Sequence, residues 1–186
     1  MTASIRIVPL DPDLDRGAFA SGVEALDRYF RERVTQDVRR RVASCFVALD
    51  REGGVSAKGR PEGEHRSAEH EGTSVSGFYT LSAASVLLAD LPAAVATRLP
   101  RYPTVPAVRL GRLAVARTRR GQGLGAALLA DALARSLASE IAAFALIVDA
   151  KDDMASAFYR HHGFLPFADA PGTLFLPLAT ARAAWR

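Results

Sequence analysis

Three alternate glycines in the segment GQGLGA (121–126) form the part of this chain whose residue types best suit ligand chemistry. The segment follows a hydrophobic run at 107–115 and opens a run rich in leucine and alanine. Where a strand turns through glycines into a helix, the first N–H groups of the helix face outward and bind anions such as phosphate. Arg117, Arg119 and Arg120 add mobile positive charge beside this turn. We therefore expect a phosphate-binding cradle here.

A dinucleotide is one ligand that such a cradle could hold. Gly121, Gly123 and Ala126 fit the dinucleotide fingerprint, and Asp149 ends the next predicted strand. Five residues separate Val115 from the first glycine, however, whereas the fingerprint opens directly after its strand. Only about 60 residues follow the glycines, too few for the remaining strands of a dinucleotide domain. These two facts count against a dinucleotide-binding domain.

Apolar runs along the chain predict the elements that position the cradle. Ser21 followed by Glu24 has the pattern of a capping box, and apolar residues at intervals of three or four from Val23 to Val38 predict one helix after it. The other expected helices lie within 91–99, at about 124–139 with Leu129, Leu133 and Leu137 packed on a sheet, and in the segment that ends at Gly163. The expected strands are residues 5–9, 43–50, 75–84, 107–115, 144–150, 164–167 and 173–177.

Length and composition place the chain among ordinary globular proteins. Its 186 residues, 49% of them hydrophobic, suit one domain with its own core. The single cysteine, Cys45, cannot form an internal disulfide, and the N-terminal residues lack the apolar stretch of a signal peptide. No run reaches the roughly 18 apolar residues of a membrane span. We expect a single cytoplasmic domain over residues 1–186.

Residues 51–74 differ in character from the rest of the chain. They contain five glycines and no aromatic residue, which predicts a flexible loop. His65 and His70 lie in this segment without a cysteine or a carboxylate cluster beside them. We therefore expect both to be solvent-exposed and predict no metal site.

Arginine dominates the positive charge of the chain. The net charge is +4, and all but two of the 24 basic residues are arginine. Six arginines fall between residues 28 and 41, against one glutamate and one aspartate. Such a segment either forms a solvated face or contacts the phosphates of a ligand. The candidates for phosphate contact are Arg28, Arg31, Arg39, Arg40 and Arg41.

The run LGRLAVARTRRGQGLGAALL, followed by AFYRHHGF, resembles the GNAT acyl-CoA N-acetyltransferases. Their signature R/Q-x-x-G-x-G/A is matched by Arg120, Gly123 and Gly125. The segments SGVEALDRYF, LGRLAV, VDAKDD and TLFLPL further resemble the GNAT toxins of type II toxin–antitoxin modules. The resemblance covers nearly the whole chain apart from residues 51–74. It implies an α/β fold with a mixed central sheet of about six or seven strands, a V-shaped splay in that sheet, and flanking helices.

The resemblance also implies a role for each site residue. The pyrophosphate of acetyl-CoA, the donor substrate, would bind the backbone amides of residues 121–126 and the region of Arg120. The pantetheine arm would pair with the backbone of residues 113–115. Tyr159 stands where the family has the tyrosine that protonates the departing CoA thiolate. The implied donor-binding set is Leu113, Ala114, Val115, Arg120, Gly121, Gln122, Gly123, Leu124, Gly125, Ala126 and Asp152.

Asp152 departs from the family pattern, because many relatives carry asparagine seven residues before the tyrosine. An ionised carboxylate accepts hydrogen bonds but cannot donate one to pantetheine. No general base stands out either, and water could take the proton of an amine that is already largely neutral near pH 8. We expect the two adjacent histidines at the surface. The possible bases are Asp149, Asp152, Asp153, Glu24, His161 and His162.

These expectations define one reaction and leave its acceptor open. Acetyl would pass directly from acetyl-CoA to a primary amine, with no metal and no covalent enzyme intermediate. The preferred acceptor is the α-amine of an aminoacyl-tRNA, bound through the arginines between residues 28 and 41, so that acetylation blocks translation. The alternatives are a small amine or a protein N-terminus, and a non-catalytic module that binds CoA or an antitoxin. The toxin resemblance also implies a separately encoded antitoxin, a homodimer and no membrane partner.

Overall fold

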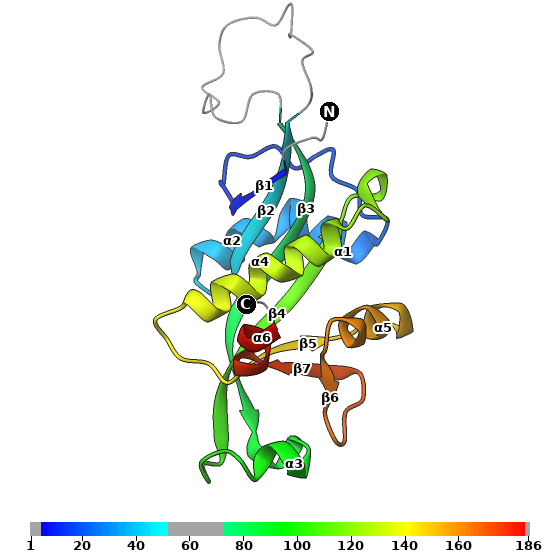
Figure 1. The fold of residues 1–186 in the computed structure, drawn as a ribbon. Coiled ribbons are helices and arrows are strands. Elements are labelled where there is room, and N and C mark those ends of the chain that lie inside the picture. Colours follow the sequence, from blue (N-terminus) through cyan, green and yellow to red (C-terminus); the bar gives the residue numbers. More distant parts are fainter. Residues whose placement is uncertain (1–4, 52–72, 185–186) are drawn as a thin grey trace, which may run out of the picture. The chain divides into compact units, whose positions relative to one another are not determined.

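A computed structural model describes residues 5–51 and 73–184 of the chain. Seven strands pair in the order β1-β2-β3-β4-β5-β7-β6, and helices flank this mixed sheet (Figure 1). The described residues form two compact units. The first holds the residues up to Thr80 together with Arg112–Leu129, and the second holds Leu81–Gly111 and the residues from Ala130 onward. Strands β3 (Thr73–Leu87) and β4 (Thr104–Val115) and helix α4 (Leu124–Ala138) contribute residues to both units.

The first unit is built around aromatic residues that the sequence brings from three separate segments. The rings of Phe30 and Phe78 stack at 4.2 Å, and Phe19 meets both edge-on at 5.0 and 5.5 Å. All three side chains are buried. Such contacts add to the free energy gained from removing the rings from water. The unit contains β1 (Ile5–Pro9), which pairs antiparallel with β2 (Ser44–Arg51), and the helices α1 (Glu24–Glu32) and α2 (Val34–Arg39).

The second unit has its own core, in which Phe167 and Phe175 pack at 5.1 Å beside buried Ala145 and Ile147. In this unit β5 runs parallel to β4 and antiparallel to β7. A short 3-10 helix, Leu88–Asp90, and α3 connect β3 to β4. The remaining elements are α3 (Ala93–Ala96), β5 (Ala145–Asp149), α5 (Asp153–His161), β6 (Leu165–Pro166), β7 (Thr173–Pro177) and α6 (Leu178–Ala184).

The strands follow the apolar runs of the sequence closely, but the first predicted helix is two helices. Arg33 has φ −116° and ψ −33° and separates α1 from α2. The apolar stripe nevertheless crosses this break, because Phe30 and Val34 are both fully buried. The capping box is also wrong: α1 begins at Glu24 and has no side-chain cap. Instead, the hydroxyl of Ser21 binds the carboxylate of Asp27.

Two further expectations differ from the structure. Leu137 is 36% exposed at the end of α4, whereas Leu129 and Leu133 are buried as predicted. Strand β3 begins at Thr73, so the last two residues of the predicted loop 51–74 belong to a strand. The rest of that loop, including both histidines, lies outside the described residues apart from residue 51. No helix in the described ranges is long and apolar enough to span a membrane.

Candidate functional site

The glycine loop lies between β4 and α4, in the first unit. A 3-10 turn over Arg117–Arg119 leads from the strand into the loop, and α4 begins at Leu124. Gly121 and Gly123 have φ values of 73° and 78°, in the left-handed region that favours glycine. A Cβ atom at either position would meet no other atom within 4 Å. Glycine is therefore needed for the backbone conformation, and it leaves the outer face of the loop open to a ligand.

The backbone N–H groups of residues 121–126 have no hydrogen-bond acceptor among the described residues. The first N–H group of this junction to find one is that of Ala127, which donates to the carbonyl of Gly123 at 3.1 Å. Unpaired N–H groups at the start of a 15-residue helix carry partial positive charge, which the helix dipole reinforces. The backbone of the loop thus has the N–H groups that an anion site needs, and the cradle itself stays a prediction.

The arginines of the loop are less mobile than we expected. Arg119 forms an ion pair with the buried carboxylate of Asp50 and donates to the side-chain oxygen of Gln122 at 3.2 Å. The guanidinium of Arg120 donates to the backbone carbonyl of Ser21. Only Arg117, of the three, has an exposed side chain with no polar partner in the described part of the chain. Of the three arginines expected to be mobile beside the loop, only Arg117 is therefore without a polar partner in the described part of the chain.

Beyond Leu110, strand β4 is no longer paired with β5, and this stretch leads directly into the loop. The ladder between β4 and β5 ends at the pair Leu110 and Val148, although β4 continues to Val115. Residues 113–115 thus lie beyond the last rung, as a splay between the two strands requires. Close packing at this level depends on Gly77 of β3, since a Cβ there would lie 2.9 Å from the carbonyl oxygen of Ala114 and from a methyl of Leu128. Sequence reasoning missed this residue, although a glycine inside a strand is a signal of close approach.

Tyr159 lies on α5 in the second unit and is 8% exposed. Its ring packs against Phe158 and Phe164 at centroid distances of 5.2 and 5.4 Å. The hydroxyl has no hydrogen-bond partner among the described residues. Burial raises the pKa of this phenol to about 12, because the charged phenolate would lose its hydration. Tyr159 is therefore protonated at neutral pH and can donate a hydrogen bond to a ligand.

The acidic residues near the ends of β5 and α5 are held by partners. Both carboxylate oxygens of Asp149 are engaged, one by Arg109 and the other by Thr173 at 2.9 Å. Asp152 caps α5 by accepting from the backbone N–H of Ala155 at 2.7 Å, and it pairs with the adjacent Lys151. These contacts lower the pKa of Asp152, with the Lys151 hydrogen bond as the largest cause. Both carboxylates thus have structural partners on the protein surface.

The other possible bases occupy ordinary surface positions. His161 is exposed at the end of α5, and the Nδ1 atom of His162 lies 2.8 Å from the carbonyl of Phe158. Glu24 pairs with Arg31 at 3.6 Å, and Asp153 is exposed in the first turn of α5. The geometry singles out none of them as a base.

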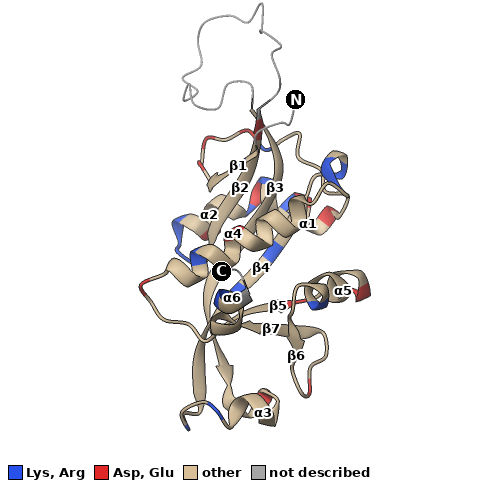
Figure 2. Cartoon of the chain, in the orientation of Figure 1, with Lys and Arg blue, Asp and Glu red and all other residues tan. Residues whose placement is uncertain are grey.

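The basic residues of α1 and α2, coloured blue in Figure 2, divide into two kinds by their contacts. Arg31 is half-buried and is held by Glu24 and by the carbonyl of Phe19 at 3.3 Å. Arg28 is exposed and has no ionic partner among the described residues, and the same is true of the three consecutive arginines 39–41 at the end of α2. Arg28 and these three side chains, which we call the arginine surface, can contact a polyanion, whereas Arg31 is occupied.

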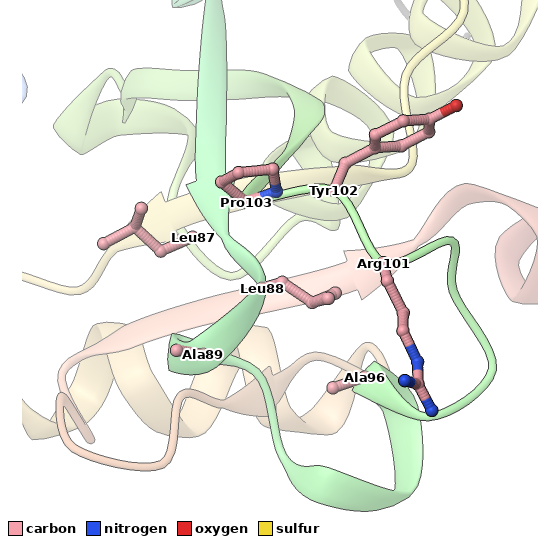
Figure 3. Close-up of a pocket in the computed structure, with 7 residues that line it drawn as sticks. All are labelled: Leu87, Leu88, Ala89, Ala96, Arg101, Tyr102 and Pro103. Carbon is pink, nitrogen blue, oxygen red and sulfur yellow. The ribbon is translucent and has the colours of Figure 1, made fainter.

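An apolar pocket lies elsewhere, in the second unit, and contains none of the predicted site residues (Figure 3). It is formed by the end of β3, the 3-10 turn that follows it, the end of α3 and the segment before β4. Both Leu87 and Tyr102 are more than half exposed. Within the described ranges, no group of three or more histidine, cysteine or acidic side chains is placed to hold a metal ion. The lining residues are Leu87, Leu88, Ala89, Ala96, Arg101, Tyr102 and Pro103.

Comparison with known proteins bears on the resemblance noted in the sequence. Residues 43–166 match the family model of the acetyltransferase (GNAT) domain. The chain is 36% identical over 171 residues to the tRNA-acetylating toxin of Mycobacterium tuberculosis, which covers 91% of this chain and 89% of that protein. The structure of AtaT complexed with acetyl-methionyl-tRNAfMet has a TM-score of 0.79 and 27% identity, over 98% of this chain and all of that one. The structure of AtaTR bound with AcCoA has a TM-score of 0.74 and 28% identity, over 98% of each chain.

These matches agree with the geometry of the loop. The family match covers well over half of the chain and includes the glycine loop, its preceding strand and α5. The mixed seven-stranded sheet with flanking helices is the fold that the resemblance implied, and the likeness to solved structures confirms it. The chain therefore belongs to the GNAT acetyltransferase family.

Proposed function

We propose that this protein transfers acetyl from acetyl-CoA to the α-amino group of an aminoacyl-tRNA and thereby acts as a translation-blocking toxin. The observation that carries the proposal is the run of six N–H groups in the loop that find no acceptor within the described residues, in a chain 36% identical to a tRNA-acetylating toxin. The loop provides an anion cradle for the donor, and the relative acts on tRNA. An N-acetylated amino acid cannot be extended at its nitrogen, which explains how one modification would stop translation.

The donor would bind along the end of β4 and across the loop. The pyrophosphate would accept hydrogen bonds from the N–H groups of residues 121–126, with Arg117 as the free cation beside it. The pantetheine amides would pair with the backbone of residues 113–115. We assign Asp152 an indirect role as the cap of α5, because its carboxylate already accepts hydrogen bonds from Ala155 and Lys151. In this arrangement the end of β4, which holds the pantetheine arm, would orient the thioester.

The reaction would proceed through a tetrahedral intermediate. The neutral amine attacks the thioester carbonyl carbon, the carbon–sulfur bond breaks, and the sulfur leaves with the bonding electron pair. Tyr159, whose phenol is protonated and unpartnered, would donate a hydrogen bond to that sulfur. The proton released by the amine passes to water, since none of the candidate acids is placed as a base.

The acceptor would approach through the arginine surface, because four exposed arginines without ionic partners suit the phosphates of tRNA. AtaT complexed with acetyl-methionyl-tRNAfMet and AtaTR bound with AcCoA support both substrates. We assign the protein to the cytoplasm, where charged tRNA and acetyl-CoA meet. We also infer a separately encoded antitoxin that restrains it; a homodimer stays a prediction.

The test is transfer of labelled acetyl from acetyl-CoA to total aminoacylated tRNA. We expect label on the aminoacyl group, released together with the amino acid when the ester is hydrolysed. Deacylated tRNA, which lacks the amine, is the matched control and should take up none. Binding of acetyl-CoA without any label on aminoacyl-tRNA would contradict the tRNA acceptor and point to a small amine or a protein N-terminus.

A further inference from the structure

A buried carboxylate organises the turn that precedes α1. Asp27 is 5% exposed, and one of its oxygens accepts from the backbone N–H and the hydroxyl of Ser21, at 2.8 and 2.5 Å. Its other oxygen accepts from the backbone N–H of Gly22 at 3.2 Å. Burial alone would raise the pKa of Asp27, but these hydrogen bonds and the nearby Arg31 lower it overall. The carboxylate is thus charged at neutral pH and fixes residues 21 and 22.

The same turn also contacts the glycine loop. The guanidinium of Arg120 donates to the carbonyl of Ser21, and the backbone N–H of Arg117 donates to the carbonyl of Ala20 at 3.0 Å. Gly22 has φ 84°, and a Cβ there would lie 3.0 Å from the Arg117 side chain, so the turn and the loop pack closely. Both carbonyls that the loop uses therefore belong to residues within or next to the turn that Asp27 fixes.

Capping of α1 does not by itself account for this arrangement. The residue at the N-cap position, Val23, offers no side-chain cap, and Asp27 turns its carboxylate toward residues 21 and 22 of the preceding turn. The exposed Glu24 stands earlier in the same first helical turn, and its one ionic partner among the described residues is Arg31. The helix dipole would act on any carboxylate in this first turn, so it does not explain why Asp27 accepts hydrogen bonds from residues 21 and 22.

We propose that Asp27 is a positioning residue for the glycine loop: it holds residues 21 and 22, and with them the adjacent carbonyls on which Arg117 and Arg120 dock, and so sets the amides of residues 121–126 for the pyrophosphate of acetyl-CoA. This inference rests on the proposed function, in which that loop binds the donor. Asp27 itself contacts no substrate. Its removal shifts the loop and weakens the pyrophosphate contacts, while the β4 edge, which serves pantetheine, keeps its geometry.

The test compares two donors in four proteins: wild type, Asp27→Asn, Ser21→Ala and the control Glu24→Gln. Acetyl-CoA uses the loop, whereas S-acetyl-pantetheine carries the same thioester arm without pyrophosphate or nucleotide. The dissociation constant of acetyl-CoA is measured by calorimetry, and kcat/KM for both donors by acetyl transfer to aminoacyl-tRNA. The melting temperature of each variant is measured alongside.

For Asp27→Asn we expect the dissociation constant of acetyl-CoA to rise about tenfold, the factor that corresponds to about 1.4 kcal/mol. The KM for acetyl-CoA rises with it, kcat is retained, and kcat/KM for S-acetyl-pantetheine changes by less than about twofold. Ser21→Ala keeps the carboxylate but removes one of its donors, so it shows the same selectivity with about a threefold loss. Glu24→Gln leaves all values unchanged.

An equal loss for both donors would make Asp27 a residue of general stability and overturn the inference, as would unchanged affinity for acetyl-CoA. If Asp27→Asn fails to fold, the ratio of the two donors in Ser21→Ala decides the matter by the same criterion. A wild-type protein that binds no acetyl-CoA would contradict the proposed function and the inference with it. Normal wild-type binding and transfer with an unaffected Asp27→Asn variant would contradict the inference alone.

Discussion

Replacing Tyr159 with phenylalanine tests the proposed chemistry most directly. The change removes one oxygen from a side chain that is 8% exposed and keeps the ring against Phe158 and Phe164. The hydroxyl has no hydrogen-bond partner among the described residues, so its loss should change the free energy of unfolding by less than about 0.5 kcal/mol. We expect the rate of acetyl transfer to fall by about 10²–10⁴, or roughly 2.7–5.4 kcal/mol in the activation free energy.

The raised pKa of Tyr159 constrains how it acts. Complete transfer of a proton from a phenol with a pKa of about 12 to a free thiolate, whose conjugate acid has a pKa of about 8.5, is uphill by about 5 kcal/mol. The phenol must therefore hydrogen-bond to the sulfur while the carbon–sulfur bond breaks. Because the phenol stays protonated below its pKa, the rate should show no decline due to Tyr159 between pH 7 and 10.

The assay is single-turnover acetylation of aminoacyl-tRNA by wild type, Tyr159→Phe and the control Tyr102→Phe. Tyr102 is 66% exposed, so loss of its hydroxyl should leave the rate unchanged. Calorimetry should give the same dissociation constant of acetyl-CoA for all three proteins. Full activity in Tyr159→Phe would refute the reasoning. So would a loss that is explained by a lower melting temperature or by weaker acetyl-CoA binding.

Two further predictions concern the arginines. Arg119→Ala leaves the buried Asp50 without its ionic partner and should lower the free energy of unfolding by about 3 kcal/mol. Arg117→Ala should change the free energy of unfolding by less than about 0.5 kcal/mol. The same Arg117→Ala variant should weaken acetyl-CoA binding about fivefold. Chemical denaturation and calorimetry distinguish the two, and a reversed order would show that Arg119 is the ligand-binding arginine. Changing all three residues of 39–41 to glutamate should abolish the steep salt dependence of tRNA acetylation while acetyl-CoA binding persists. Equal loss of both activities would remove these arginines from the tRNA surface.

The sequence was sufficient to predict the backbone of the site, because that backbone depends on local residue types. The glycines at 121 and 123 adopt the positive φ values that glycine permits, and β4 and α4 end and begin where the apolar runs do. Tyr159 could be assigned to a helix that ends near Gly163 for the same reason. Each of these features is decided within a few residues of chain.

The fate of the side chains could not be predicted in this way. The partners of Arg119 and Arg120 are Asp50 and Ser21, which lie about 70 and 100 residues earlier in the chain. An arginine beside a glycine loop has no evident partner when only its neighbours in sequence are considered. The break at Arg33 escaped detection because the apolar spacing continues across it, so periodicity alone could not separate one helix from two.

The docking of Arg120 changes what the loop can contribute to binding. The guanidinium of Arg120 donates to the Ser21 carbonyl, and that of Arg119 pairs with Asp50. In the proposed donor complex, the phosphates would therefore be held mainly by N–H dipoles and by Arg117. Amide dipoles have no counterions to release, whereas tRNA binding by the arginine surface does release them. Raising salt from 50 to 500 mM should therefore weaken tRNA binding by several orders of magnitude and acetyl-CoA binding by roughly tenfold or less. Calorimetry with each ligand measures both slopes, and an equally steep slope for acetyl-CoA would mean that the arginines leave their protein partners to bind it.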